Sequence, residues 1–435
     1  MSDLSPRLEE AFGRLTPWIR SHFPQIETLR NGSRRIYMDN AAGTLIPETA
    51  AAAMAEAALW SNPQPDRSWP AARAAGRAIY EARDLLREFL NAPAEDPIFL
   101  SESSTASLFK LRDALEPAWQ PTSRILVTDC DHFANVSPWE WRAEGRWEVN
   151  RIRMAPDGTL DLDSLAGLLS SRVRLVALSA ASNGLGTRIA LEKAIPLIRS
   201  VVPTSWVVVD AVHGAPHFPL DVAALGADAL ALSTYKLFGP VCGVLWIRRS
   251  RLPELQPYHV APHDDPETGL EWGTLNPVTV AGIRAALEYL LRLGERLEPV
   301  CVGRWTTYDR RRRLFKLALE GIRAYEAGLS RQVLTGLRDV PALELYGIGD
   351  PDRVRERAPT FAFAGGGMAD PVWEQELWVR GGIQAACGNH YAGSLLRGLG
   401  RQGAVRASLA HYNTSDEVAF LLRVLTDLCT STARR

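Results

Sequence analysis

Two charged residues stand at the ends of apolar segments that have the character of buried strands. Asp210 closes the segment Trp-Val-Val-Val-Asp, and Lys236 follows the segment Ala-Leu-Ala-Leu-Ser-Thr-Tyr further along the chain. At the edge of an apolar core a lysine loses hydration, which lowers its pKa and frees its amine to form an imine. A carboxylate at such an edge can hold a cationic ring nitrogen. The two residues together predict imine chemistry beside a buried anion.

This pairing is what a pyridoxal 5′-phosphate (PLP) enzyme needs, because a lysine holds the cofactor aldehyde as a Schiff base and an anion holds its pyridinium nitrogen. Such an enzyme also needs a phosphate site. The segment Ser-Glu-Ser-Ser-Thr at 101–105 follows a predicted strand and opens a predicted helix, where hydroxyls and free N–H groups favour a phosphate. Ser233 is a second candidate donor. Ordinary helix capping and a plain turn are the alternatives for these residues.

Three further polar residues follow predicted strands. His132 could stack on a flat cofactor ring and move a proton, or simply cap the next helix. Asn183 could donate to a phenolic oxygen, or serve the turn Ser-Asn-Gly-Leu-Gly. His213, three residues after Asp210, could reach the same oxygen, or be an ordinary core histidine.

Arg406 lies in the apolar segment Ala-Val-Arg-Ala-Ser-Leu near the end of the sequence. An arginine among apolar neighbours requires a planar anion. In an enzyme that acts on amino acids this anion is the substrate α-carboxylate, held by two parallel hydrogen bonds. An internal salt bridge is the alternative.

The composition is that of a globular protein large enough for two or three domains. Its 435 residues are 46% hydrophobic and 23% charged, with a net charge of −1. That balance gives no electrostatic reason to expect nucleic acid or an anionic membrane as the main partner. No apolar run is long enough to cross a membrane, and no secretion signal is visible. Five scattered cysteines without a Cys-x-x-Cys spacing predict reduced thiols in the cytoplasm and no metal site.

Strands alternate with helices through the middle of the chain, where helices are predicted at 104–115, 162–171 and 191–201. The alternation favours an α/β fold whose mostly parallel sheet is covered on both faces. In such a sheet a ligand binds where strands end and helices begin. The seven predicted strands are 97–100, 124–128, 147–152, 175–180, 206–209, 229–232 and 243–247.

The pattern changes beyond residue 276. Two long helices are predicted there, at 278–302 and at 304–323. A smaller α+β region follows, with strands predicted near 343–346, 360–364 and 405–410. The first 30 residues are predicted to be helical and to pack outside the main sheet.

Taken in order, the motifs resemble those of the class V aminotransferase family of fold-type I PLP enzymes, and specifically its cysteine desulfurase branch. The likeness runs from residues 37–43 to residues 406–414 and covers most of the chain. The ordered set is far more specific than any single motif. It consists of Asp-Asn-Ala-Ala, a Ser/Thr turn, Asp-His-x-Ala-Asn, Ser-Asn-x-x-Gly, Val-Asp-Ala-x-His, Ser-x-x-Lys-x-x-Gly-Pro and Arg-x-Ser-x-x-x-Tyr-Asn-Thr.

The resemblance implies a large PLP-binding domain with a mostly parallel seven-stranded sheet, and a smaller α+β C-terminal domain. We expect these domains at 31–294 and 295–435, with 1–30 as a helical segment packing with the small domain. The stretch Gly-Thr-Leu-Asn is similar to one whose threonine reaches the phosphate of the neighbouring subunit. The resemblance therefore implies a homodimer in which Thr274 completes the partner's site.

The family's site residues transfer to the positions that match its motifs. Three would act in catalysis: Lys236 as the Schiff-base lysine, Asp210 at the pyridinium nitrogen and His132 stacked on the ring. The other cofactor contacts would be Asn183 and His213 at the phenolic oxygen, and Ser104, Thr105, Ser233 and Tyr235 near the phosphate. Tyr235 stands where desulfurases usually have a histidine, and His213 where they usually have a glutamine. The substrate would meet Arg406, Asn183, His390 and Tyr391.

One loop departs from the desulfurase pattern. Desulfurases carry their persulfide-forming cysteine in a loop of the form Gly-His-His-Cys-Ala, whereas this chain reads Gly-Asn-His-Tyr-Ala at 388–392, so Tyr391 takes the cysteine's place. A phenol cannot accept sulfur as a persulfide. Cys387, four residues upstream of Tyr391, could substitute only if the loop folded back.

These observations predict a PLP-dependent enzyme acting on an amino acid, and first a C–S lyase that works by β-elimination. Tyr391 or His390 would supply the acid near the leaving sulfur. An aminotransferase and an amino-acid epimerase are alternatives on the same scaffold, and a PLP-fold binding subunit without activity is a third. Selectivity for the substrate side chain is expected from the loops at 60–69, 259–272 and 388–394.

Overall fold

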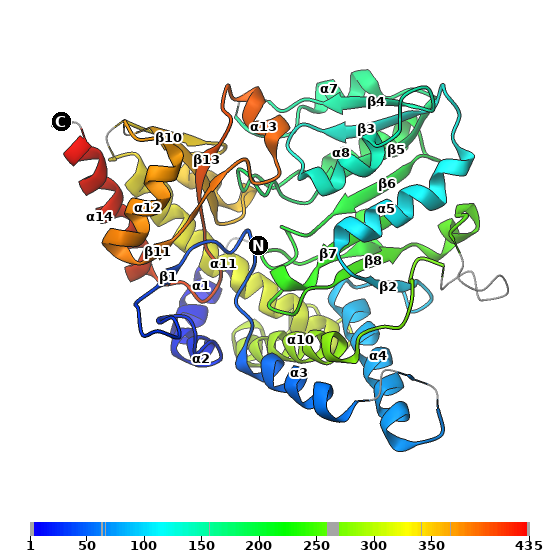
Figure 1. The fold of residues 1–435 in the computed structure, drawn as a ribbon, viewed down its shortest axis with the longest axis horizontal. Coiled ribbons are helices and arrows are strands. Elements are labelled where there is room, and N and C mark those ends of the chain that lie inside the picture. Colours follow the sequence, from blue (N-terminus) through cyan, green and yellow to red (C-terminus); the bar gives the residue numbers. More distant parts are fainter. Residues whose placement is uncertain are drawn as a thin grey trace.

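The computed structural model describes residues 4–61, 64–65, 67–155, 157–258, 269–340, 342–365 and 367–432. Its largest element is a seven-stranded sheet in the order β2-β8-β7-β6-β5-β3-β4, in which β8 alone runs against its neighbours (Figure 1). This confirms the predicted α/β fold with a mostly parallel seven-stranded sheet. The strands are β2 (Ile98–Ser101), β3 (Arg124–Thr128), β4 (Glu148–Ile152), β5 (Val173–Ser179), β6 (Trp206–Asp210), β7 (Ala229–Ser233) and β8 (Gly243–Ile247).

Alternate residues of each strand enter two apolar cores, one on each face of the sheet. In β6, Val207 and Val209 belong to a core that includes residues of α8 (Leu191–Val201) and α10 (Pro277–Leu297). Trp206 and Val208 belong to the opposite core, which includes residues of α5 (Ser104–Leu115). Because both faces are buried, the strands are continuous apolar runs, and this is why the sequence predicts them closely.

The N-terminal helices lie outside the sheet. The first of them, α1 (Leu4–Arg14), packs against α11 (Arg310–Leu337), where the rings of Phe12 and Tyr325 stack 5.0 Å apart. Both α3 (Glu48–Trp60) and α4 (Pro70–Phe89) pack on α10. The other α-helices among the described residues up to 300 are α2 (Thr16–Ser21), α6 (Ser137–Glu140), α7 (Leu162–Leu168) and α9 (Val222–Leu225). None of the described helices has both the length and the apolar character that crossing a membrane requires.

A smaller unit, on the left of Figure 1, is built on an antiparallel sheet in the order β12-β13-β10-β9. Its strands are β9 (Leu343–Tyr346), β10 (Thr360–Gly365), β12 (Ala386–Gly388) and β13 (Ala404–Ser408), and its helices are α12 (Asp370–Gly381), α13 (Gly393–Gly398) and α14 (Ser415–Thr432). A short parallel pair, β1 (Ile36–Tyr37) with β11 (Ile383–Gln384), ties this unit to the N-terminal segment. The predicted boundary at 294/295 lies in the last turn of α10 and stays a prediction.

The two long helices differ from their predicted bounds. The first, predicted to reach residue 302, ends as α10 at Leu297, because Pro299 has no N–H to continue the ladder and its ring clashes with the preceding turn. The second, predicted at 304–323, is α11 at Arg310–Leu337. It starts late because Gly303 and Trp305 adopt left-handed φ values of 75° and 53°, which no right-handed helix contains. It ends late because its apolar face continues through Leu329, Val333 and Leu337.

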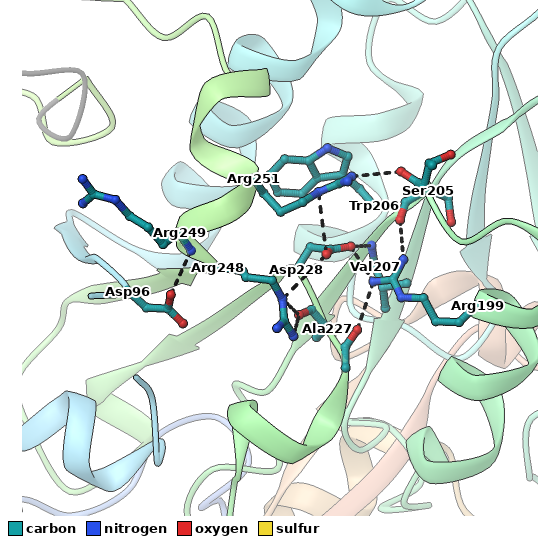
Figure 2. A network of polar contacts seen from close by, with 12 residues as sticks. Asp96, Arg199, Ser205, Trp206, Val207, Ala227, Asp228, Arg248, Arg249 and Arg251 are labelled. Atoms are coloured by element: carbon teal, nitrogen blue, oxygen red, sulfur yellow. Dashed lines mark hydrogen bonds and ion pairs between the residues drawn. The ribbon is translucent and has the colours of Figure 1, made fainter. Parts of the chain in front are cut away.

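A buried ion-pair network fixes the beginning of the strands that lead to Asp210 and Lys236 (Figure 2). Asp228, immediately before β7, accepts a hydrogen bond from the N–H of Val207 at the start of β6 (2.8 Å) and one from Arg199 of α8 (2.6 Å). Arg251 lies 3.6 Å from the same carboxylate. Asp228 is 4% exposed, so it joins two neighbouring strands inside the protein. The β6–β7 register is thereby set at one end, and the carboxyl ends of both strands meet at the other.

Replacing Asp228 with alanine should destabilise the protein markedly. The change leaves the buried N–H of Val207 without an acceptor and Arg199 without its anion, which should cost about 2–4 kcal/mol of unfolding free energy. The midpoint of guanidinium denaturation measures this. Asp339→Ala, at an exposed position, is the matched control and should change the midpoint little. Equal denaturation midpoints for the two variants would contradict the proposed contribution of the Asp228 network to the unfolding free energy.

Candidate active site

Two adjoining cavities open at the carboxyl edge of the large sheet. The larger has a volume of about 790 Å³ and extends toward β12, the segment 388–391 and Arg406. The smaller, of about 40 Å³, lies deeper and is lined by Asp210 and His213. Both are lined by Thr105, His132, Asn183, Tyr235 and Lys236, so they form one continuous site. Most of the residues predicted from different motifs therefore face one space.

Lys236 is buried at the end of the short turn that follows β7, with 5% of its surface exposed. Burial and, to a lesser extent, the positive charge of Arg406 lower the pKa of its ammonium to about 8. Asp210 and Asp39 act in the opposite direction. About a tenth of the amine is therefore neutral at pH 7, far more than for a lysine with the ordinary pKa, and the neutral amine is the form that attacks a carbonyl carbon.

Asp210, the last residue of β6, is buried and lines the smaller cavity together with Lys236. Its Oδ1 accepts a hydrogen bond from the N–H of Val212 (2.8 Å). Burial raises the pKa of this carboxyl, whereas the Val212 hydrogen bond and the charge of Lys236 lower it. A cationic ring nitrogen in the cavity would favour the ionised carboxylate further, because opposite charges stabilise each other strongly at a buried site.

His132 follows β3 and has the capping role that the sequence offered as one alternative, whereas stacking on a cofactor ring stays a prediction. Its Nδ1 accepts a hydrogen bond from the N–H of Ala134 (2.9 Å), so it caps the turn after it, while its ring lines both cavities. Burial, Lys236 and Arg406 lower its pKa to about 4. The imidazole is therefore neutral at neutral pH and carries its proton on Nε2. A flat uncharged ring of this kind can stack on an aromatic cofactor.

The neighbouring Asp131 is a positioning residue that motif reasoning missed. One carboxylate oxygen accepts from the N–H of Ser179 at the end of β5 (3.2 Å), and the other from the amide of Asn135 (2.7 Å). Burial raises its pKa to about 7. Asp131 thus fixes the segment that carries His132 against the next strand. The Asp-His-x-Ala-Asn motif contains both Asp131 and Asn135, and their four-residue spacing is the signal that could have indicated a closed turn.

Asn183 and His213 each leave a buried polar atom without a partner among the described residues. The Asn183 amide donates to the carbonyl of His390 (2.7 Å), and its Oδ1 has no partner. The His213 Nε2 lies 3.1 Å from the hydroxyl of Thr360, and its Nδ1 has no partner. Burial holds the pKa of His213 well below its ordinary value, so the ring is neutral. Unpaired buried polar atoms are costly, so their presence in one cavity fits a site for a polar ligand.

The candidate phosphate end lies at the start of α5. The Ser103 hydroxyl caps this helix by accepting from the N–H of Ala106 (3.1 Å), while Ser104 and Thr105 line the smaller cavity. A Cβ on Gly243 of β8 would lie 2.2 Å from the backbone of Ser103, so only glycine allows this close approach. The remaining hydroxyls and N–H groups of the turn fit a phosphate group.

The other two candidate phosphate contacts differ in their placement. Ser233, the last residue of β7, donates its hydroxyl to Ser104 (2.8 Å) and is not among the residues that line either cavity. Ser233 therefore orients Ser104 in this structure. Tyr235 lines both cavities, and burial, reinforced by Asp210, raises the pKa of its phenol. The phenol accordingly keeps its proton and can donate a hydrogen bond.

Arg406 forms the internal salt bridge that the sequence offered as one alternative, whereas its contact with a substrate carboxylate stays a prediction. Its Nη2 donates to Asp39 (3.1 Å) and its Nη1 to the carbonyl of Asn183 (3.1 Å), so the internal salt bridge exists. The guanidinium also lines the larger cavity, and its buried Nε has no partner among the described residues. Asp39 belongs to the Asp-Asn-Ala-Ala motif, but its pairing with a residue 367 positions away has no local signal in the sequence.

The loop that replaces the desulfurase cysteine loop is bound tightly to the site. His390 and Tyr391 both adopt left-handed φ values, 50° and 55°. The carbonyl of Tyr391 accepts from the N–H of Phe133 (2.7 Å), and the His390 Nε2 lies 2.9 Å from the carbonyl of Ala404. Burial lowers the His390 pKa to about 4, so this ring is neutral and a weak proton donor. Tyr391 is 67% exposed and lines the larger cavity, and its ring centroid lies 5.3 Å from that of His132.

Cys387 lines the same cavity from β12, but its environment does not favour a reactive thiolate. Its N–H donates to Glu374 (2.9 Å). Burial, together with the hydrogen bond and charge of Glu374, raises the pKa of the thiol to about 11. The thiolate is the nucleophilic form of cysteine, and little of it exists at neutral pH.

The remaining predicted residues either lie away from the two cavities or belong to the loops expected to select the substrate. Thr274 is exposed and is not among the residues that line either cavity of the single chain. Of the loops expected to select the substrate, 388–391 lines the larger cavity. Residues 259–268 of the loop 259–272, and residues 62, 63 and 66 of the loop 60–69, lie outside the described residues.

Comparisons with known proteins agree with this geometry. The model of the aminotransferase class V family matches residues 36–297 and 312–421. A probable cysteine desulfurase of Mycolicibacterium paratuberculosis is 31% identical over 94% of this chain, which spans 57% of that protein. A cysteine desulfurase of Klebsiella pneumoniae is 30% identical, with 92% of this chain and 95% of that protein covered. The structure of the cysteine desulfurase CsdA of Escherichia coli is similar with a TM-score of 0.76 at 27% identity, covering 96% of this chain and 98% of that one.

The lowered pKa of Lys236 predicts how its reactivity depends on pH. Only the neutral amine attacks an aldehyde, so the rate at which cofactor-free protein takes up PLP should rise as the pH increases through about 8 and then level off. Stopped-flow absorbance of the imine measures this rate. A lysine with the ordinary pKa of 10.5 would give a rate that still climbs toward that pH, and such a profile would contradict the assignment.

Proposed function

Since the chain belongs to the class V aminotransferase family, whose members use PLP, we propose that it is a C–S lyase that removes the sulfur substituent of a β-thio amino acid. The observation that carries this proposal is the cavity shared by Lys236 and Asp210, with Arg406 at its outer part and Tyr391 in place of a thiol. The relatives named as cysteine desulfurases support a sulfur-containing substrate.

Different residues that line the site would contact different parts of the cofactor. We assign Lys236 to the aldehyde carbon, Asp210 to the ring nitrogen and His132 to the face of the ring. Asn183 and His213 would meet the phenolic oxygen, for which their unpaired atoms and the second N–H of the Asn183 amide are suited. Ser104, Thr105 and Tyr235 would meet the phosphate. When bound, PLP withdraws electrons from the substrate α-carbon, which weakens the bonds to that atom.

The protein's own groups then determine which bond breaks. Arg406 holds the α-carboxylate through its guanidinium, and the salt bridge with Asp39 keeps that group in place before substrate arrives. The Lys236 amine, with a pKa near the working pH, takes the proton from the α-carbon. The C–S bond breaks with its electron pair on sulfur, and the Tyr391 phenol gives sulfur a proton. His390 is less suited to that step because burial keeps it neutral.

Sulfur would leave as hydrogen sulfide or a free thiol, not as a persulfide on the protein. Tyr391 occupies the position of the persulfide-forming cysteine, and the Cys387 thiol is held protonated beside Glu374. Water then converts the remaining three-carbon unit to an α-keto acid and ammonium. Transamination and epimerisation would use the same proton transfer by Lys236, and neither needs an acid at the position of Tyr391.

The proposal extends to the assembly and its compartment. We infer a homodimer in which Thr274 reaches the partner's phosphate site, which agrees with its exposed position in the single chain. The five free cysteines support a reducing compartment such as the cytoplasm. The expected ligand is a small amino acid, for which the cavity has a guanidinium and a reactive amine.

Lys236→Ala should remove both the yellow colour of the purified protein and its activity, because no other residue lining the site has a primary amine. Activity is measured as sulfide, thiol and α-keto acid released from cysteine, cystine and other thio amino acids. The exposed Lys193→Ala is the matched control and should retain colour and turnover. Full activity in Lys236→Ala would refute the proposed function, and so would a coloured wild-type protein that releases neither sulfur nor keto acid from any of these substrates.

The two residues near the leaving sulfur should behave oppositely. Tyr391→Phe should lower kcat about 100-fold while leaving KM and colour nearly unchanged, since only the proton donor is lost. Cys387→Ser should keep kcat within about two-fold, because a thiol with a pKa of about 11 takes no part in elimination. The reverse result, an inactive Cys387→Ser and an unimpaired Tyr391→Phe, would indicate a relocated persulfide mechanism.

A further inference from the structure

A separate cavity of about 210 Å³ lies where α1, α11 and the segment 351–356 meet. Its wall includes Arg304 and Trp305 from the connection before α11, Glu320 and Arg323 from α11, and Arg355. None of these residues lines the cavities around Lys236. Neither the proposed lyase activity nor the family motifs give this second cavity a role.

The cavity wall has an unbalanced positive charge. Three guanidiniums face it, whereas Glu320 is the one carboxylate among its described lining residues. That carboxylate lies 3.9 Å from Arg323. Within the described part of the chain, neither Arg304 nor Arg355 forms an ion pair, and two acidic residues near Arg355 or Arg323 have other partners. Glu356 pairs with Arg353, and Glu192 pairs with Arg188.

Arg323 is the central cation of the group. Its side chain is 32% exposed, so it lies partly inside the wall and not free in solvent. Burial lowers its pKa, Glu320 and Glu192 raise it, and the like charges of Arg188 and Arg355 lower it. Like charges at a partly buried position repel each other, so an anion in the cavity would reduce a repulsion that Glu320 and Glu192 offset only in part.

Trp305 supplies a firm aromatic wall beside these cations. It adopts a left-handed φ of 53°, an uncommon conformation for a bulky residue. The Lys316 ammonium lies 5.6 Å from the centroid of its ring, which adds one more cation near the cavity. Among the described residues no other aromatic ring stacks on the Trp305 indole, so the face of this ring is not covered by another aromatic side chain.

We propose that this cavity binds the phosphate group of a small molecule. Guanidiniums bind phosphate through paired N–H donors, and three of them around one space suit a multiply charged oxyanion better than a single carboxylate. The volume accommodates inorganic phosphate, pyrophosphate or a short phosphorylated metabolite, and excludes a polymer from the interior. Because the ligand would contact α1, α11 and the segment 351–356 together, its binding should also stabilise the fold.

The test is calorimetric titration of the PLP-loaded protein with inorganic pyrophosphate, inorganic phosphate and glycerol phosphate at constant ionic strength. Saturable binding is expected, and Arg323→Gln and Arg355→Gln should each raise the dissociation constant at least ten-fold. Arg331→Gln, an exposed position further along α11, is the matched control and should leave it unchanged. Tighter binding of glycerol phosphate than of inorganic phosphate would identify an organic phosphate as the ligand.

Two results would overturn the proposal. One is binding no tighter than that of chloride for all three probes. The other is pyrophosphate binding that neither Arg323→Gln nor the exposed Arg355→Gln weakens, which would place the anion elsewhere, for example at the cofactor phosphate site. Lys236→Ala should bind pyrophosphate as the wild type does at the arginine cavity. The test therefore holds even if the proposed lyase function fails.

Discussion

The parallel pairing of β6 with β7 is the constraint on which the site depends. Asp210 lies opposite Ala231 in this pairing, and Lys236 follows five residues later, so both reach the same edge of the sheet. A slip of one residue would turn Asp210 toward the other face and separate the carboxylate from the amine. The Asp228 network holds the opposite end of these strands. The chemistry at one edge therefore depends on a salt bridge at the other.

The electrostatics of the site follow from burial. Desolvation, reinforced by the charge of Arg406 and for His132 also by that of Lys236, lowers the pKa of His132 and His390 and keeps both rings neutral. Asp210 and Asp39 balance only part of this positive charge. The net positive charge of the site favours the binding of anions, and the proposed cofactor and substrate supply a phosphate and a carboxylate. Neutral histidines can then serve as flat surfaces and hydrogen-bonding groups without adding further charge.

The sequence predicted most of the fold because local patterns determine it. The strands of the large sheet are apolar runs closed by polar residues, and their bounds differ from prediction by at most two residues. The residues around Lys236 were predictable because each follows a strand in a recognisable motif. The contacts of Asp39 with Arg406, and of Asp131 with Ser179, were not, since they join distant segments. The structural contacts predicted as alternatives for His132 and Arg406 are present, and they leave the ring of the one and the Nε of the other free to meet a ligand.

The left-handed pair His390 and Tyr391 has an evolutionary implication. A thiol that passes sulfur to an acceptor outside the pocket must move out of the pocket, which requires a mobile loop. Here the His390 carbonyl accepts a hydrogen bond from the Asn183 amide, and the Tyr391 carbonyl accepts one from the N–H of Phe133. Replacing Tyr391 with cysteine would therefore add a thiol at a position whose backbone is too restrained to carry sulfur out of the pocket. Divergence between carriers and non-carriers of sulfur on this scaffold would then require changes in loop tethering as well as in one side chain.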